Sequence, residues 1–311
     1  MASLLTARHH PDCYPSDAAT ALDFFREALK SFPAAEVPPA PRESSLLGIV
    51  TPHIDFRVTL RSYAAAFHPL LQVPLADTYL ILGVGHRSPL EWNLDRRDYL
   101  TPFGKAECAT DLIDRLAADI DPARLFSLPA HNGEHSIEFP LLWLQALHRL
   151  HPQPSDKPVR FVPLLCGGLH PFIEGGMEWD ELDDFHLLTR NLAGLFRQFP
   201  PGEKLGIIVS IDGCHLGPRF DHPFPVTSVL LKVTAGWEER LWAEVAKGEA
   251  RRFLEWLRDE GNDRYFDGVG ALALLLAAGE GKITVQRTFY EQWFTEEDAS
   301  AVTFSSGRVL A

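Results

Sequence analysis

The stretch TYLILGVGH, residues 78–86, is apolar almost without interruption and then ends in a glycine and a histidine. A strand with one face in solvent alternates apolar and polar residues, whereas a strand covered on both faces is apolar throughout. Two later stretches have the same character, RFVPLLCGG at 160–168 and LGIIVSIDG at 205–213. These runs predict strands of a sheet that carries helices on both faces.

Segments of strand character alternate with segments of helical periodicity along most of the chain. This alternation favours an α/β sandwich in which a mostly parallel central sheet is flanked by helices. The expected strands are 46–50, 78–83, 160–165, 205–210, 283–290 and 301–308. The expected helices are 18–31, 58–71, 110–120, 137–150, 181–199, 226–247, 250–260 and 268–278. No helix separates the last two strands, so we expect them to pair antiparallel at an edge of the sheet.

The chain divides into a short N-terminal part and one large body. Residues 1–45 comprise the first helix and a proline-rich link, PAAEVPPAPRE at 33–43, and residues 46–311 are expected to form a single domain. Of the 311 residues, 46% are hydrophobic and 23% are charged, which is a globular composition with enough apolar material for a large core.

Charge and cysteine usage argue against several kinds of partner. The formal net charge of −13 is unsuited to a nucleic-acid-binding surface, which needs a basic stripe. The N-terminus lacks the apolar core of a signal peptide, and the longest apolar run, 271–279, is too short to span a bilayer. The four cysteines are scattered without a CxxC pair, as in reduced cytosolic proteins. We therefore expect a cytoplasmic protein without nucleic-acid or membrane partners, whose oligomeric state the sequence leaves open.

Histidines follow three of the expected strands at a corresponding position. His53 follows the first strand in TPHIDF, His86 the second in GVGH, and His215 the fourth in SIDGCH. Ligands of open α/β sheets gather at the carboxyl ends of the strands, so these imidazoles are expected along one edge. His135, in NGEHSIE just before a helix, is a fourth candidate. A single loop histidine is usually a turn residue, but four near the ends of elements predict a metal centre.

The remaining ligands decide which metal such a site prefers. Neither HExxH nor clustered cysteines are present, so the usual zinc motifs are missing. Two imidazoles and one carboxylate are typical of non-heme Fe(II) sites that react with O₂. Asp55, Asp212 and Asp267 are the carboxylates near element ends. Asp267 directly precedes the apolar helix 268–278, where it is also interpretable as an N-cap residue.

Five stretches resemble, in the same order, motifs of the Memo family: TPHIDF, ILGVGHRSPL, GEHSIEFPLLWL, SIDGCHLG and SAVTFSSGRV. The resemblance covers roughly residues 46–308. It implies a single-domain α/β fold similar to that of class III extradiol dioxygenases, which are non-heme iron enzymes. It also implies metal binding by His53 and His86. The further pocket positions that match the family motifs are Asp212, His215, His135 and Glu138.

The chain departs from the family pattern at three places. The third metal-binding residue of the family is a cysteine, and Asp267 stands at the corresponding position. Because the third ligand of the dioxygenases is a carboxylate, the resemblance implies a shell of His53, His86 and Asp267. This shell favours Fe(II), with Mn, Zn and Cu as the other candidates. Arg87 replaces a frequent family histidine, and Arg57 belongs to the sequence DFR, where the family has a small residue and a tyrosine.

The first functional hypothesis is a non-heme iron oxygenase or oxidase that acts with O₂ on a small organic substrate. In this hypothesis His215 is the general acid–base, and Asp212 orients it or holds it charged. His135 and Glu138 line the pocket or support the ligands. The arginines at 57 and 87 bind an anionic group of the substrate or are surface and salt-bridge residues.

Two other classes of protein remain open. A non-catalytic metal- or peptide-binding protein is the main alternative. Asp267 discriminates between the two, since a binding protein needs no carboxylate-completed shell with open positions, whereas an oxygenase does. A hydrolase with Cys214 as nucleophile is the weaker one. GxSxG is absent, and Cys214 directly precedes His215, so the two side chains need not face each other.

Overall fold

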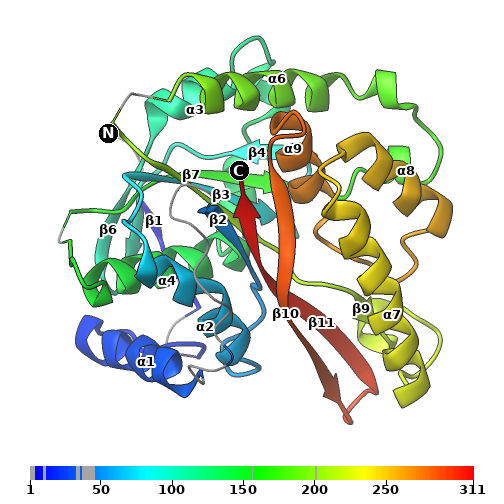
Figure 1. The fold of residues 1–311 in the computed structure, drawn as a ribbon, viewed down its shortest axis with the longest axis horizontal. Helices are drawn as coiled ribbons and strands as arrows, with labels where there is room; N and C mark the ends of the chain where they lie inside the picture. Colours follow the sequence, from blue (N-terminus) through cyan, green and yellow to red (C-terminus); the bar gives the residue numbers. More distant parts are fainter. Residues whose placement is uncertain (1–3, 10–11, 33–35, 37–45, 156, 200–201) are drawn as a thin grey trace.

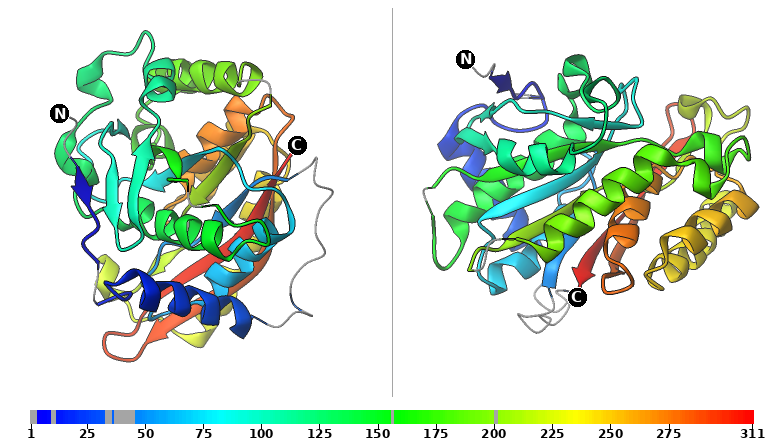
Figure 2. Two further views of the ribbon diagram at one scale, coloured as in Figure 1. Left: turned by 90° about the vertical axis from the view of Figure 1, so that its left-hand side faces the viewer. Right: turned by 90° about the horizontal axis from the view of Figure 1, so that it is seen from above.

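A single sheet with helices on both faces organises the protein (Figure 1, Figure 2). The structure is a computed structural model that describes residues 4–9, 12–32, 36, 46–155, 157–199 and 202–311. The strand order is β1-β5-β6-β7-β3-β8-β2-β11-β10, with β4 beside β7 and β9 beside β11. The predicted α/β sandwich is therefore confirmed.

The strands at the centre of the sheet are those that the apolar runs predict. Four neighbours run parallel: β7 (Arg160–Cys166), β3 (Thr78–Val84), β8 (Leu205–Ser210) and β2 (Leu46–Thr51). At one edge the predicted antiparallel pair is confirmed, formed by β11 (Ser300–Leu310) and β10 (Thr284–Thr295). The remaining strands are short: β1 (Leu5–Thr6), β4 (Trp92–Leu94), β5 (Tyr99–Thr101), β6 (Gly104–Cys108) and β9 (His215–Leu216). The sheet is thus parallel at its centre and mixed at its edges.

Two helical layers cover the sheet (Figure 1). One layer contains α1 (Ala18–Ser31), α2 (Arg61–Phe67) and α4 (His135–Leu150). The other contains α3 (Thr110–Leu116), α6 (Asp183–Arg197) and α9 (Val269–Ala278), and it is extended by α8 (Ala250–Glu260) and α7 (Ser228–Val245). A short helix, α5 (His170–Ile173), follows β7.

Side chains of β3 show why the central strands are apolar at every position. Leu80 and Leu82 pack into the core shared with α3, α6 and α9, whereas Tyr79 and Ile81 pack into the core shared with α1, α2 and α4. All four are buried. A strand between two helical layers has no solvent-facing side, so the sequence cannot alternate.

The helix predicted at 58–71 is shorter than expected. α2 begins at Arg61 and gives way to a 3₁₀ turn, η3 (His68–Gln72). Pro69 has no amide hydrogen for an α-helical bond, so the α-helix ends before it. The predicted link at 33–43 lies, apart from Glu36, outside the described residues.

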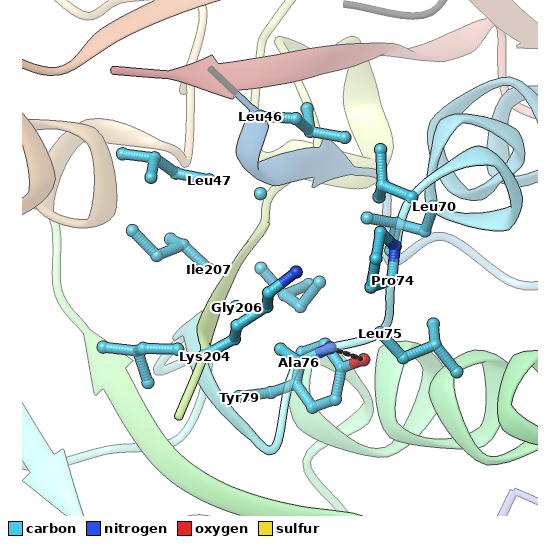
Figure 3. A pocket seen from close by; sticks show the side chains of 14 residues that line it. Leu46, Leu47, Leu70, Pro74, Leu75, Ala76, Tyr79, Lys204, Gly206 and Ile207 are labelled. Carbon is cyan, nitrogen blue, oxygen red and sulfur yellow. Dashed lines mark hydrogen bonds between the residues drawn. The ribbon is translucent and has the colours of Figure 1, made fainter. Parts of the chain in front are cut away.

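The amino-terminal ends of the central strands border a cavity of about 610 Å³ (Figure 3). It is largely apolar, with Leu46, Leu75, Tyr79 and Ile207 among its lining residues. None of the predicted site residues lines this cavity, and those that follow a central strand lie at its opposite, carboxyl end. Within the described ranges, every helix is too short or too polar to cross a bilayer.

Candidate metal centre

Three parallel strands deliver predicted site residues to one edge of the sheet. β2 leads into His53, β3 into His86 and β8 into Asp212. The ring centroids of His53 and His86 are 5.0 Å apart. Because the strands are parallel, turns that follow their carboxyl ends meet in space although they are distant in sequence.

The first turn of α4 adds a third imidazole. His135 is the first residue of this helix, and its ring stacks on His86 with centroids 4.6 Å apart. Its centroid lies 5.1 Å from that of His53, with the two rings edge to face. Sequence reasoning expected His135 to be a pocket residue, and the structure brings it about as close to both histidines as they are to each other.

Glu134 holds this arrangement together, and sequence reasoning did not single it out. Its Oε1 accepts the amide hydrogen of Ser136 at 3.1 Å, which caps α4, and it accepts from His86 Nδ1 at 3.0 Å. Burial raises the pKa of Glu134, but the hydrogen bond and the charge of His86 have the larger, opposite effect, and the pKa is lowered to about 2. The ionised carboxylate thus accepts a hydrogen bond from His86 Nδ1, which leaves Nε2 as the nitrogen available to a metal. The only signal in the sequence was its place directly before His135.

The two ring nitrogens of the buried His53 have different surroundings. Nδ1 lies 3.1 Å from the carbonyl oxygen of Ser210, which only accepts, so Nδ1 carries a hydrogen. Among the described residues, Nε2 makes no hydrogen bond of good geometry. It lies 3.3 Å from Asp267 Oδ2 and 3.7 Å from Asp212 Oδ2. In the neutral ring, Nε2 therefore presents a lone pair beside two carboxylates, which is a donor set suited to a cation.

The two aspartates differ in their hydrogen bonds. Asp212 Oδ1 accepts the amide hydrogens of His53 at 2.9 Å and Ile54 at 3.2 Å. Both oxygens of Asp267 are buried, and within the described part of the chain neither accepts a hydrogen bond. The N-cap of α9 is Gly268, without a side-chain cap. The N-cap interpretation of Asp267 is therefore wrong.

Charge and burial set opposite protonation states for neighbouring histidines. Burial lowers the pKa of His53, but Asp212 and Asp267 raise it more, to about 10. Burial and the charges of His53 and His86 lower the pKa of His135 to about 2. Burial raises the pKa of Asp267, yet the contact with His53 lowers it overall. Without a metal, His53 thus carries a proton at neutral pH and His135 is neutral.

The atoms that can bind a metal fall into two overlapping groups. One group comprises His53, His86 and His135, and the other comprises His53, Asp212 and Asp267. Within each group the ligand atoms lie within 4.8 Å of one another. His53 belongs to both groups. The predicted triad of His53, His86 and Asp267 takes one further ligand from each group and is not itself one of the two groups.

A cavity of about 970 Å³ opens beside both groups. Its polar lining includes His86, His135, Asp212, His215 and Asp267. Its apolar and aromatic lining includes Ile54, Val58, Phe220, Tyr265, Trp293 and Val302. A small organic molecule therefore has room to reach the candidate centre.

Two other predicted residues have partners that the sequence did not indicate, and a third lies outside the cavity. His215 Nδ1 donates to the carbonyl oxygen of Tyr265 at 3.1 Å, and among the described residues no hydrogen bond joins His215 to Asp212. Arg57 lines the cavity but is paired with Asp55. Arg87 is exposed and does not line the cavity.

Glu138 faces the N-terminal segment instead of the cavity. Its buried carboxylate accepts the amide hydrogens of Arg8 at 2.9 Å and His9 at 3.0 Å, and the hydroxyl hydrogen of Tyr14. Burial raises the pKa of Glu138, but the hydrogen bonds of His9 and Tyr14 lower it overall. The carboxylate of the EHSIE sequence therefore anchors a segment that is distant in sequence.

Comparisons with known proteins agree with the motif pattern. A profile described as Memo-like protein matches residues 6–307. A MEMO1 family protein of Thermus thermophilus is 27% identical over 77% of this chain and 65% of its own length. MEMO1 family proteins of Methanosarcina barkeri and Aquifex aeolicus are 29% and 28% identical, over 57% and 67% of this chain. These two matches cover 57% and 50% of the relatives' own lengths, so the chain spans only about half to two thirds of these proteins.

Proposed function

Because the chain belongs to the Memo family, we propose that its histidine–aspartate cluster is the metal centre of an oxidoreductase that acts on a small organic substrate. His53 Nε2 supports this most directly, since it is buried 3.3 Å from Asp267 Oδ2 and, among the described residues, neither atom makes a hydrogen bond of good geometry. Buried polar atoms without partners cost free energy. A divalent cation between them satisfies the nitrogen and the carboxylate together.

Fe(II) is the metal that this donor set favours. Two imidazoles and one carboxylate with open positions are typical of iron sites, and we assign His53, His86 and Asp267 as ligands. Mn, Zn and Cu are the alternatives. Bound iron supplies the redox chemistry by which an organic substrate reacts with O₂. His135 is close enough to His53 and His86 to serve as a further ligand.

The protein's own residues bind the substrate and move its protons. His215 lines the cavity, and its Nδ1 is held by the carbonyl of Tyr265, which leaves Nε2 free to exchange a proton with a bound molecule. Asp212 fixes the backbone of His53 through two amide hydrogen bonds. Apolar and aromatic side chains supply most of the remaining lining, so the substrate carries an apolar part.

The test is the metal content of protein purified without oxygen, followed by O₂ consumption after Fe(II) is added. Asp267→Asn preserves the volume of the side chain but removes its charge, so bound iron should fall from about one equivalent to a small fraction. Asp111→Asn, at an exposed aspartate in the first turn of α3, is the matched control and should keep its iron.

The outcomes separate the two functional classes. Iron that is retained equally in Asp267→Asn would remove Asp267 from the shell. Iron in the wild type without O₂ consumption, across a panel of catechols and other oxidisable small molecules, would favour the non-catalytic metal-binding protein. Absence of bound metal in the wild type after reconstitution would reject the metal centre altogether.

A further inference from the structure

Two cavities meet at the candidate metal centre. The second, of about 610 Å³, is lined by residues from the ends of β3 and β7 and by the 261–267 loop, with Gly85, Gly167 and Asn262 among them. It shares His86, Asp267 and Tyr265 with the larger cavity. The first two residues belong to the proposed metal shell, so Tyr265 is the shared residue whose role is unexplained.

Tyr265 has a backbone conformation that tyrosine rarely adopts. Its φ angle is 48°, in the left-handed region, where a side chain crowds the backbone. The loop holds it there, because its amide donates to the Asn262 carbonyl at 2.9 Å and the Asn262 Oδ1 accepts the next amide, of Phe266, at 2.9 Å. Strain of this kind persists where the surrounding structure enforces it, often at binding sites.

The backbone and the ring of Tyr265 each make one contact that fixes the residue. Its carbonyl oxygen accepts from His215 Nδ1, the residue proposed as the acid–base. Its ring stacks on His222 with centroids 4.7 Å apart and an angle of 29° between the planes. His222 is itself fixed, since its Nε2 lies 2.7 Å from the carbonyl oxygen of Asp263. One face of the tyrosine ring is thus supported, yet the residue is 47% exposed.

We propose that Tyr265 is a substrate-positioning residue, against whose ring a planar, unsaturated part of the substrate stacks while another part reaches the metal. This role rests on the proposed metal-dependent function. A ring that is supported on one face and open to the cavities is a ready stacking surface for an aromatic group. Phe220 and Trp293 line the same cavity and suit the same class of ligand.

Two hydroxamates test this role in Co(II)-loaded protein by titration calorimetry. Benzohydroxamate and acetohydroxamate chelate a metal through the same group, but only the first carries an aromatic ring. Tyr265→Gly should weaken benzohydroxamate binding about fivefold, equivalent to about 1 kcal/mol, and leave acetohydroxamate binding within about twofold. Tyr265→Phe keeps the ring and should bind both probes as the wild type does.

Glycine is chosen because it adopts the left-handed backbone without strain. Tyr265→Gly should therefore unfold at a temperature no lower than the wild type, whereas loss of a residue needed only for folding would lower that temperature. Asp119→Gly relieves the same kind of strain, at φ 64°, in a position that lines neither cavity. It should leave the affinities for both hydroxamates unchanged.

The failures of the positioning role and of the metal centre are distinguishable. Equal benzohydroxamate affinity in the wild type and Tyr265→Gly, with Co(II) bound to both, overturns the stacking role and leaves the metal centre standing. A parallel loss of both hydroxamates also overturns stacking, since the ring-free probe is then affected equally. A wild-type protein that binds no Co(II) overturns the proposed function and the role of Tyr265 together.

Discussion

Replacing Glu138 with glutamine tests whether this carboxylate anchors the N-terminal segment. The buried group accepts hydrogen bonds from the amides of Arg8 and His9 and from the Tyr14 hydroxyl. Hydrogen bonds to a charged group contribute about 1.5–3 kcal/mol each, and neutral ones about 0.5–1.5 kcal/mol. Glutamine retains one neutral oxygen and turns an amide donor toward these donors, so at least one of them loses its partner. The free energy of unfolding should fall by about 3–5 kcal/mol, which is the usual cost of removing one member of a buried charged interaction.

Urea denaturation at pH 7 measures this loss. Glu107→Gln is the control, because Glu107 forms an exposed pair with Lys105 and its replacement should change stability by less than about 0.5 kcal/mol. The pKa of Glu138 is lowered in the folded protein, so its contribution is complete above the ordinary glutamate pKa of about 4.3 and is lost as the pH falls through the folded value. The difference between wild type and variant should shrink in that acid range. A loss below about 1 kcal/mol at pH 7 would refute the anchoring role.

Two further predictions concern the proposed metal centre and the packing of α9. Burial lowers the pKa of His53, yet Asp212 and Asp267 raise it to about 10, so a metal must displace a proton at neutral pH. Co(II) binding should release about one proton, and its association constant should rise about tenfold per pH unit between roughly pH 6 and 8; calorimetry that finds pH-independent affinity would contradict this. In α9, a Cβ at position 270 would lie 2.2 Å from the carbonyl oxygen of Gly167. Gly270→Ala should therefore lower the melting temperature, although alanine usually stabilises a helix by about 1 kcal/mol over glycine; an unchanged Tm would show that this contact is not tight.

The central strands could be predicted because each lies between two helical layers and is apolar at every position. The short strands beyond β7 could not. β6 reads GKAEC, and Lys105 and Glu107 interrupt any apolar pattern. A strand of three to five residues can have the same composition as a loop, so only its pairing distinguishes it.

Some residues of the candidate site could likewise be located from the sequence, and others could not. His53, His86 and Asp212 could be located because the end of a buried strand is visible in the sequence. The closeness of His135 to His86 depends on how the first turn of α4 is oriented against β3, which spacing does not determine. The partners of Glu138 lie about 130 positions away in the sequence, a distance over which no local pattern applies.

The register of the parallel strands β2 and β8 determines when the candidate ligands come together during folding. His53 and Asp212 are 159 positions apart, and they meet because Thr51 of β2 is aligned with Ser210 of β8. A slip of one residue would turn the side chains of β2 to the opposite face. Contacts between such distant parts of a chain form slowly, so the ligand atoms converge only in a fully assembled sheet. If the proposed centre binds a metal, the ion would therefore bind only to folded chains, and by mass action it would stabilise those whose strands are correctly aligned.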